Sequence, residues 1–187
     1  MTRRPALRDH VATMIMSRAA AVLAERGDGV SMADIAKAAD VGRATIYRYF
    51  PTRDALITAM GEAALEDLGA RVAEAGLESV PVAEAIARIT RAFIGSGQYA
   101  ALVRGQRGGC LDSAEINRRI SDPIRELLQR GIDSGVLRKD MSAEVMLTLS
   151  GGLLQAGMTL ATSIGGEQAS AAITTVLLDG VRSRSAD

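Results

Sequence analysis

The clearest candidate for chemistry in this chain is a short basic stretch, residues 43–49, with the sequence RATIYRY. In a helix each residue turns by roughly 100°, which places Ile46 on the inner side. The outer side then carries Arg43, Ala44, Thr45, Tyr47 and Arg48. Guanidinium groups bind the edge of guanine, Ala and the Thr methyl pack on thymine, and hydroxyl groups bind phosphate oxygens. The stretch therefore predicts a DNA-reading helix, although a solvated arginine face has a similar pattern.

The preceding residues, 31–42, predict the element that would hold this helix in place. Ser31 and Asp34 have the spacing of a capping box, with Asp in the usual place of Glu or Gln, so a helix should begin there. Asp40 tolerates the left-handed backbone that a tight turn needs. Gly42 is an acceptable N-cap for the second helix. Two short helices joined by a tight turn are typical of a helix-turn-helix, which favours DNA reading over a solvated face.

The stretch SMADIAKAADVGRATIYRYFPTRDALITAM resembles the DNA-binding half of the tetracycline-repressor (TetR) family of bacterial regulators. The resemblance covers about residues 6–60. It rests on Ala36, Val41, Thr45-Ile46-Tyr47, Tyr49-Phe50 and Arg53-Asp54-Ala55-Leu56. By position, it implies that Arg43, Ala44 and Arg48 contact bases. It also implies that Thr45, Tyr47, Tyr49 and Arg53 contact phosphates. Asp40 stands where the family commonly has glycine, and Gly42 where it commonly has serine.

Composition predicts an all-α fold of about nine helices. The 187 residues are 48% hydrophobic but only 3% aromatic, with no Trp, so the core must be aliphatic and methionine-rich. Residues 1–60 carry a net charge of +3 and the rest −3, which suits a basic DNA-binding region beside an acidic one. We expect a three-helix helix-turn-helix head at residues 1–55. A helical ligand-binding and dimerisation body should follow at 56–187.

Residues 145–166 contain no charged side chain, which makes this the most unusual segment of the body. Its length would suit a membrane span, but its Thr, Ser, Gln and Gly residues favour a helix buried at an interface. With a last helix at 167–182, a helix at 142–163 would form a four-helix homodimer interface. Leu153 and the small residues Ser150, Gly151, Gly152 and Gly157 should lie there. The alternative is that this helix belongs to the core of the monomer.

The TetR resemblance implies a ligand cavity in each body and release of DNA when the ligand binds. The candidate lining residues are Met60, Phe93, Leu102, Cys110, Leu127, Leu128, Leu149 and Leu153. Alternatively, each of these residues is an ordinary part of the hydrophobic core. A body with few aromatic residues and no histidine indicates an apolar, aliphatic or planar ligand. Arg91, Arg104 and Arg107 could pair with an anionic group, or they could be solvated. Glycines 95, 97, 105, 108 and 109 bracket an expected short helix at 98–104, which has the composition of a movable segment.

The sequence does not favour an enzyme. His10 and Cys110 are the only residues of their types, which is too few for a usual zinc site, and we expect no metal or other cofactor. The N-terminus has no apolar signal segment, which predicts a cytoplasmic protein. The prediction is a ligand-responsive transcriptional regulator, a repressor released from a palindromic operator in double-stranded DNA by a small apolar molecule. The alternatives are a ligand-blind DNA-binding or architectural dimer, and an enzyme or carrier with a vestigial head.

Overall fold

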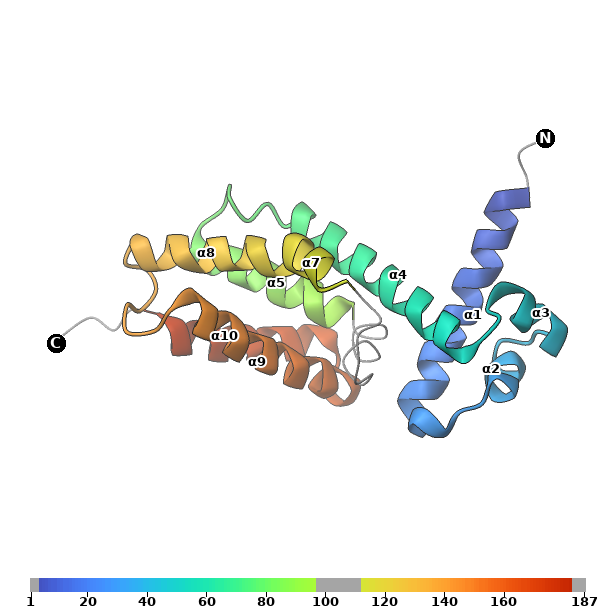
Figure 1. Cartoon of the computed structure of the whole chain (residues 1–187). Helices are drawn as coiled ribbons and strands as arrows, with labels where there is room; N and C mark the ends of the chain where they lie inside the picture. The colour runs from blue at the N-terminus through green and yellow to red at the C-terminus, as the bar shows by residue number, and fades with distance from the viewer. Residues whose placement is uncertain (1–3, 97–111, 183–187) are drawn as a thin grey trace. The chain divides into compact units, whose positions relative to one another are not determined.

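The computed structural model describes residues 4–96 and 112–182, in which the regular elements are helices (Figure 1). Within those ranges the only β pairing is an isolated bridge between Leu137 and Arg182. The predicted all-α fold class is confirmed. Described residues up to Ala64 form one compact unit, here called the head, and those from Leu65 form a second, here called the body. The division falls inside one helix, α4 (Arg53–Glu74).

The head consists of α1 (Arg4–Arg26), α2 (Met32–Ala38), α3 (Arg43–Tyr49) and the first part of α4. A single-turn 3₁₀ helix at Gly27–Gly29 ends α1. Each helix contributes an aliphatic side chain to one core. Its largest fully buried side chains are Ile15, Ile35, Ile46, Leu56 and Met60. Because the core takes a residue from every helix, it fixes the orientation of α3 within the head.

The body contains α5 (Val82–Gly95), α7 (Ser113–Ile116), α8 (Asp122–Asp133), α9 (Ala143–Ile164) and α10 (Gly166–Val181). A π-helical turn at Asn117–Ser121, here called the π turn, joins α7 to α8. Helix α9 packs against α8 and α10, and α10 also packs against α5. Asp112 caps α7 by accepting a hydrogen bond from Ala114 N, and Ser142 caps α9 by accepting one from Val145 N.

Gly157 packs inside the chain and not across a subunit interface, which corrects the expectation from sequence. A Cβ atom at Gly157 would lie 2.7 Å from Ile173 Cγ1 and 3.0 Å from Ile94 Cδ1. The missing side chain therefore lets α9 approach α10 and α5 closely. Gly151 and Gly152 are exposed, and no atom lies within 4 Å of a Cβ built on either.

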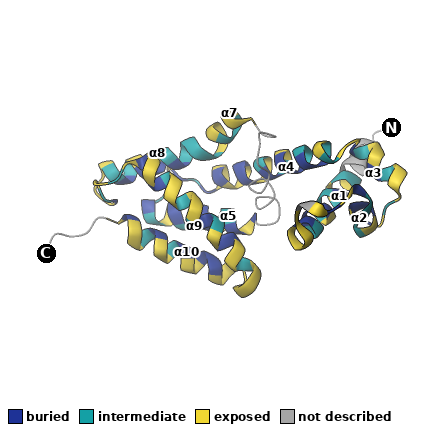
Figure 2. Cartoon of the chain, turned by 60° about the horizontal axis from the view of Figure 1, so that its bottom comes forward, coloured by how far each residue is buried: buried dark blue, intermediate teal, exposed yellow. Residues whose placement is uncertain are grey.

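Helix α9 has an exposed side (Figure 2). By residue type, the exposed positions form an apolar strip and a polar strip. The apolar strip consists of Val145, Leu149, Gly152, Ala156 and Leu160, whose spacing keeps them within one face of a helix. The polar strip consists of Thr148, Thr159 and Thr162. By length and composition alone, α9 is the one helix among the described residues that passes as a membrane span, a test that core helices of soluble proteins also pass.

Candidate nucleic-acid interface and ligand cavity

The start of α2 is fixed by the predicted capping box. The Ser31 hydroxyl accepts a hydrogen bond from Asp34 N at 3.2 Å, and the Asp34 carboxylate accepts one from Ser31 N at 3.0 Å. The Ser31 hydroxyl also donates to this carboxylate. These hydrogen bonds to the charged form lower the pKa of Asp34 below its ordinary value. The cap therefore satisfies backbone donors that would otherwise lack partners at the helix end.

The turn between α2 and α3 depends on two backbone conformations that the sequence predicts. Asp40 has a φ of +52°, in the left-handed region, and Val41 N donates to Ala36 O at 3.0 Å. Gly42 is the N-cap of α3, and its carbonyl accepts a hydrogen bond from Ile46 N at 3.1 Å. Having no side chain, Gly42 leaves the α3 terminus without a side-chain cap. Aspartate at position 40 thus takes the conformation for which glycine is the easier residue.

Helix α3 buries one face and exposes the other, as its sequence predicts. Ile46 is fully buried and Phe50 is nearly so, and both belong to the head core. Four of the predicted DNA-binding residues are exposed: Arg43, Ala44, Tyr47 and Arg48. The other three, Thr45, Tyr49 and Arg53, are half-buried. The exposed side of α3 is thus small, polar and basic, as direct reading of base edges requires.

The two exposed arginines of α3 form no ion pair with the carboxylates of the described residues. Arg48 lies over the Tyr49 ring, with its guanidinium carbon 5.4 Å from the ring centroid. Thr52 caps α4 by accepting a hydrogen bond from Ala55 N at 3.0 Å, so Arg53 begins that helix. A helix N-terminus attracts phosphate, and an arginine there adds a full positive charge.

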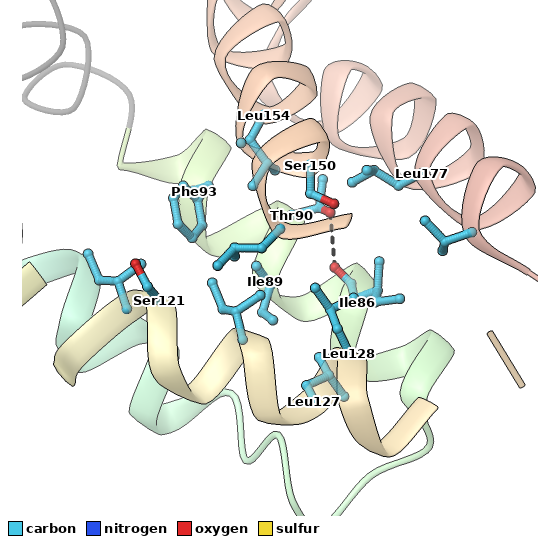
Figure 3. A pocket seen from close by; sticks show the side chains of 15 residues that line it. Ile86, Ile89, Thr90, Phe93, Ser121, Leu127, Leu128, Ser150, Leu154 and Leu177 are labelled. Carbon is cyan, nitrogen blue, oxygen red and sulfur yellow. Dashed lines mark hydrogen bonds between the residues drawn. The ribbon is translucent and has the colours of Figure 1, made fainter. Parts of the chain in front are cut away.

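The body contains a cavity of about 230 Å³ whose described walls are uncharged (Figure 3). Residues from α5, the π turn, α8, α9 and α10 line it. They are Ile86, Ile89, Thr90, Phe93, Ile120, Ser121, Ile124, Leu127, Leu128, Leu147, Ser150, Gly151, Leu154, Leu177 and Val181. A mostly apolar cavity with a few polar groups is the usual form of a small-molecule site.

Comparison with known proteins identifies the head. Residues 15–60 match the family model described as bacterial regulatory proteins, tetR family. The head is a DNA-binding region of the TetR type. The helix-turn-helix of α2 and α3 lies within the matched residues and is its DNA-binding motif. No sequence among the curated proteins matches the chain.

Solved TetR-like structures share the fold over nearly the whole length. LfrR from Mycobacterium smegmatis, in complex with proflavine, has 26% identity and a TM-score of 0.75, covering 95% of this chain and 99% of LfrR. KstR2 of Mycobacterium tuberculosis, a ketosteroid transcriptional regulator, has 17% identity and a TM-score of 0.73, covering 92% and 95%. The fatty acid degradation regulator FadR from Bacillus halodurans has 20% identity and a TM-score of 0.69, covering 98% and 100%.

The cavity of the body includes only some of the predicted lining residues. Phe93, Leu127 and Leu128 line it. Met60 does not, because it is part of the head core. Leu149 is 54% exposed on the apolar strip of α9. Leu153 is half-buried and does not line the cavity, whereas its neighbour Leu154 does. Leu102 and Cys110 lie outside the described residues, as does the expected short helix at 98–104.

Sequence reasoning missed the hydroxyl groups of the cavity wall and the link from that wall to α4. Ile120 and Ser121 of the π turn line the cavity. Arg119 of the same turn packs on Gly69 of α4, where a Cβ atom would lie 3.2 Å from Arg119 Cδ. The π turn thus contacts the cavity on one side and α4 on another. In the sequence, the pair Asp122-Pro123 marks the point where a new helix begins. It predicts a break in the helix but does not predict the π-helical geometry of the residues before it.

Proposed function

We propose that this TetR-family regulator is a cytoplasmic dimeric repressor that a small apolar molecule releases from a palindromic operator. The observation that carries the ligand response is the apolar cavity of about 230 Å³ in the body. An unfilled cavity costs a protein stability, because its lining atoms lack packing partners. A ligand-blind dimer gains nothing from retaining such a cavity, whereas a ligand-responsive one uses it. The family relatives are transcriptional regulators, so we propose no catalytic role.

For DNA recognition we assign the bases to Arg43, Ala44 and Arg48, and the phosphates to Thr45, Tyr47, Tyr49 and Arg53. The exposure of the two α3 arginines, without carboxylate partners among the described residues, supports this division. An arginine that reads a guanine edge contributes to discrimination between sequences. A residue that binds phosphate fixes register and contributes equally on every sequence.

The apolar strip of α9 supports dimerisation. Five apolar residues on one exposed face, next to α10 with its exposed Val176, form a patch that a second copy of the chain would cover. Two-fold pairing of identical faces is the commonest way to bury such a patch. A two-fold dimer places its two α3 helices on equivalent half-sites, which implies a palindromic operator. The half-sites should be separated by roughly one helical turn of DNA, or somewhat more.

Helix α4 supplies a route for coupling between ligand and DNA. It contributes Met60 to the head core and Gly69 to the body, where Arg119 packs on it. A ligand in the cavity touches Ile120 and Ser121 of the same π turn. If the ligand favours one position of this turn, it favours one position of α4 as well. Binding of ligand and binding of DNA then share one equilibrium.

The structure of LfrR with proflavine supports the idea that a fold of this kind accommodates a planar organic molecule. The experiment that tests the proposal begins with DNA. Sequences bound by the purified full-length protein are selected from a random library, and the selected site is footprinted. We expect a palindromic site bound at least 1000-fold more tightly than random DNA at physiological salt, which is about the lower limit for specific regulators. Equal affinity for selected and random DNA would contradict the proposal.

A further inference from the structure

Hydroxyl groups are the only polar side-chain groups on the cavity wall, as far as the structure describes it. They belong to Thr90 of α5, Ser121 of the π turn and Ser150 of α9. In Figure 3 these three residues lie on separate helices among aliphatic side chains. The polar groups therefore come from three different elements, and the rest of the described lining is apolar or glycine.

The three hydroxyls differ in the hydrogen bonds that they can form with a ligand. Thr90 is fully buried, and its Oγ1 donates to Ile86 O at 2.9 Å, so Thr90 offers a ligand an acceptor. The Ser121 and Ser150 hydroxyls form no hydrogen bond with another residue in the described part of the chain. Each of them can therefore donate to a ligand or accept from it. The cavity can satisfy a hydroxyl or a carbonyl group.

A charged ligand would find no partner on the described wall, which contains neither a carboxylate nor a basic group. Residues 97–111, outside the described part, contain no Asp or Glu in their sequence and cannot supply a carboxylate. Phe93 is the one aromatic residue among the described lining, too few for the cage that holds organic cations elsewhere. Burying an unpaired ammonium group is strongly unfavourable.

We infer that the cavity takes an uncharged, largely hydrocarbon molecule with a single hydroxyl or carbonyl group, and that it rejects organic cations. The inference rests on the proposed function, in which this cavity is the effector site. It separates this chain from LfrR, which was solved with proflavine, a molecule that is cationic at neutral pH. A resemblance of fold thus does not extend to the charge of the ligand.

Four probes with one ring system test the inference: naphthalene, 1-naphthol, 1-naphthoate and 1-naphthylmethylammonium. The chain has no Trp, so naphthalene emission can be followed over the weak emission of three Tyr residues. We expect 1-naphthol to bind tightest and naphthalene about three- to tenfold more weakly, which is the effect of one hydrogen bond. The ammonium probe should bind at least roughly 100-fold more weakly, and the carboxylate at least about tenfold more weakly.

The outcomes separate this inference from the proposed function. Binding of the ammonium probe within threefold of 1-naphthol would overturn the inference and leave the effector site standing. Failure of all four probes to bind would overturn the assignment of the cavity as an effector site, and the inference with it.

Substitutions locate the effect in the cavity. Thr90→Val removes the buried hydroxyl at nearly constant shape, so 1-naphthol should bind three- to tenfold more weakly while naphthalene is unaffected. Thr148→Val is the matched control, because the Thr148 hydroxyl also donates to a backbone carbonyl, Glu144 O at 3.0 Å, but is exposed. An unchanged preference for 1-naphthol over naphthalene in a Thr90→Val, Ser150→Ala double variant would overturn the role of the hydroxyls.

A gain of function tests the role of charge independently. Ser150→Asp introduces a carboxylate into the cavity wall and should improve binding of the ammonium probe at least tenfold over the unsubstituted protein. Thr148→Asp introduces the same charge on the exposed side of the same helix and should produce no gain. Equal effects of the two substitutions would overturn the inference.

Discussion

Helix α3 carries its candidate DNA-binding residues within seven consecutive positions, whereas the cavity takes its lining from five separate elements of the body. The α3 face is exposed and charged, and the cavity wall is uncharged and mostly buried. Charge-assisted hydrogen bonds are strong individually, while apolar contacts are weak individually and add up over many atoms. A single substitution on α3 should therefore change DNA binding greatly, while the response to ligand should be spread over many residues.

The largest effect should come from separating the two copies of the body, because each isolated head would then bind alone. Leu149→Glu places an unpaired charge on the apolar strip of α9, which should split the dimer. Losing the second head lowers affinity for a palindromic site by about 10²- to 10⁴-fold. Sedimentation at micromolar concentration measures the first effect, and DNA titration measures the second.

Thr162→Glu is the control, since Thr162 is exposed on the polar strip of the same helix. This variant should remain dimeric and bind DNA normally. A Leu149→Glu protein that stays dimeric would remove α9 from the proposed interface.

The next effect in size concerns the α3 face itself. Arg48→Ala should weaken binding to the selected site by about 1–3 kcal/mol while changing random DNA less, because Arg48 reads a guanine in our assignment. Tyr47→Phe should weaken all sequences evenly, as expected for a phosphate contact. Arg71→Ala is the control, because Arg71 is exposed but pairs with Asp67 at 2.8 Å. If Arg48→Ala lowered the affinity for selected and random DNA equally, Arg48 would be assigned to phosphate and not to a base.

A smaller effect is expected where the two regions are linked. Arg119→Ala removes the side chain that packs on Gly69 of α4, so it should reduce the coupling between ligand and DNA by about 1 kcal/mol. The affinity for each ligand measured alone should change little. Arg118→Ala is the matched control, because Arg118 shares the π turn and the ion pair with Glu115. Full coupling in Arg119→Ala would show that the route lies elsewhere.

The smallest effect concerns the cap of α2. Ser31→Ala should lower the Tm of the head by roughly 5 °C, the usual effect of losing an N-cap. The Ser31 hydrogen bonds depress the pKa of Asp34, so their contribution is present above the ordinary pKa of 3.8 and is lost as pH falls through the depressed value. Thermal melts between pH 7 and pH 3 should therefore show a smaller acid loss in the variant. Parallel pH curves would contradict the assignment.

The sequence predicted the head in detail because its signals are local. The capping box at Ser31 and Asp34, the left-handed Asp40 and the burial of Ile46 each depend on residues within one or two turns of one another. The exposure of Arg43 and Arg48 follows from the helical period alone.

The cavity was only partly predictable because its walls come from residues far apart in the chain. Met60 and Phe93 are equally apolar in sequence, yet one lies in the head core and the other lines the cavity. Leu149 and Leu154 belong to the same apolar helix, and only the packing of α9 against its neighbours decides which of them faces the cavity. Thr90 looked like an ordinary helix residue, since nothing local marks a hydroxyl as a cavity lining.

The most direct test of the account measures coupling from both sides. DNA affinity for the selected operator is measured with and without a saturating uncharged ligand, namely the tightest binder in a screen that begins with 1-naphthol. The affinity of that ligand is then measured with and without operator. We expect both affinities to fall by the same factor, about 5- to 150-fold, as linkage requires. Tight binding in the cavity with unchanged DNA affinity would contradict the account and favour a ligand-blind regulator.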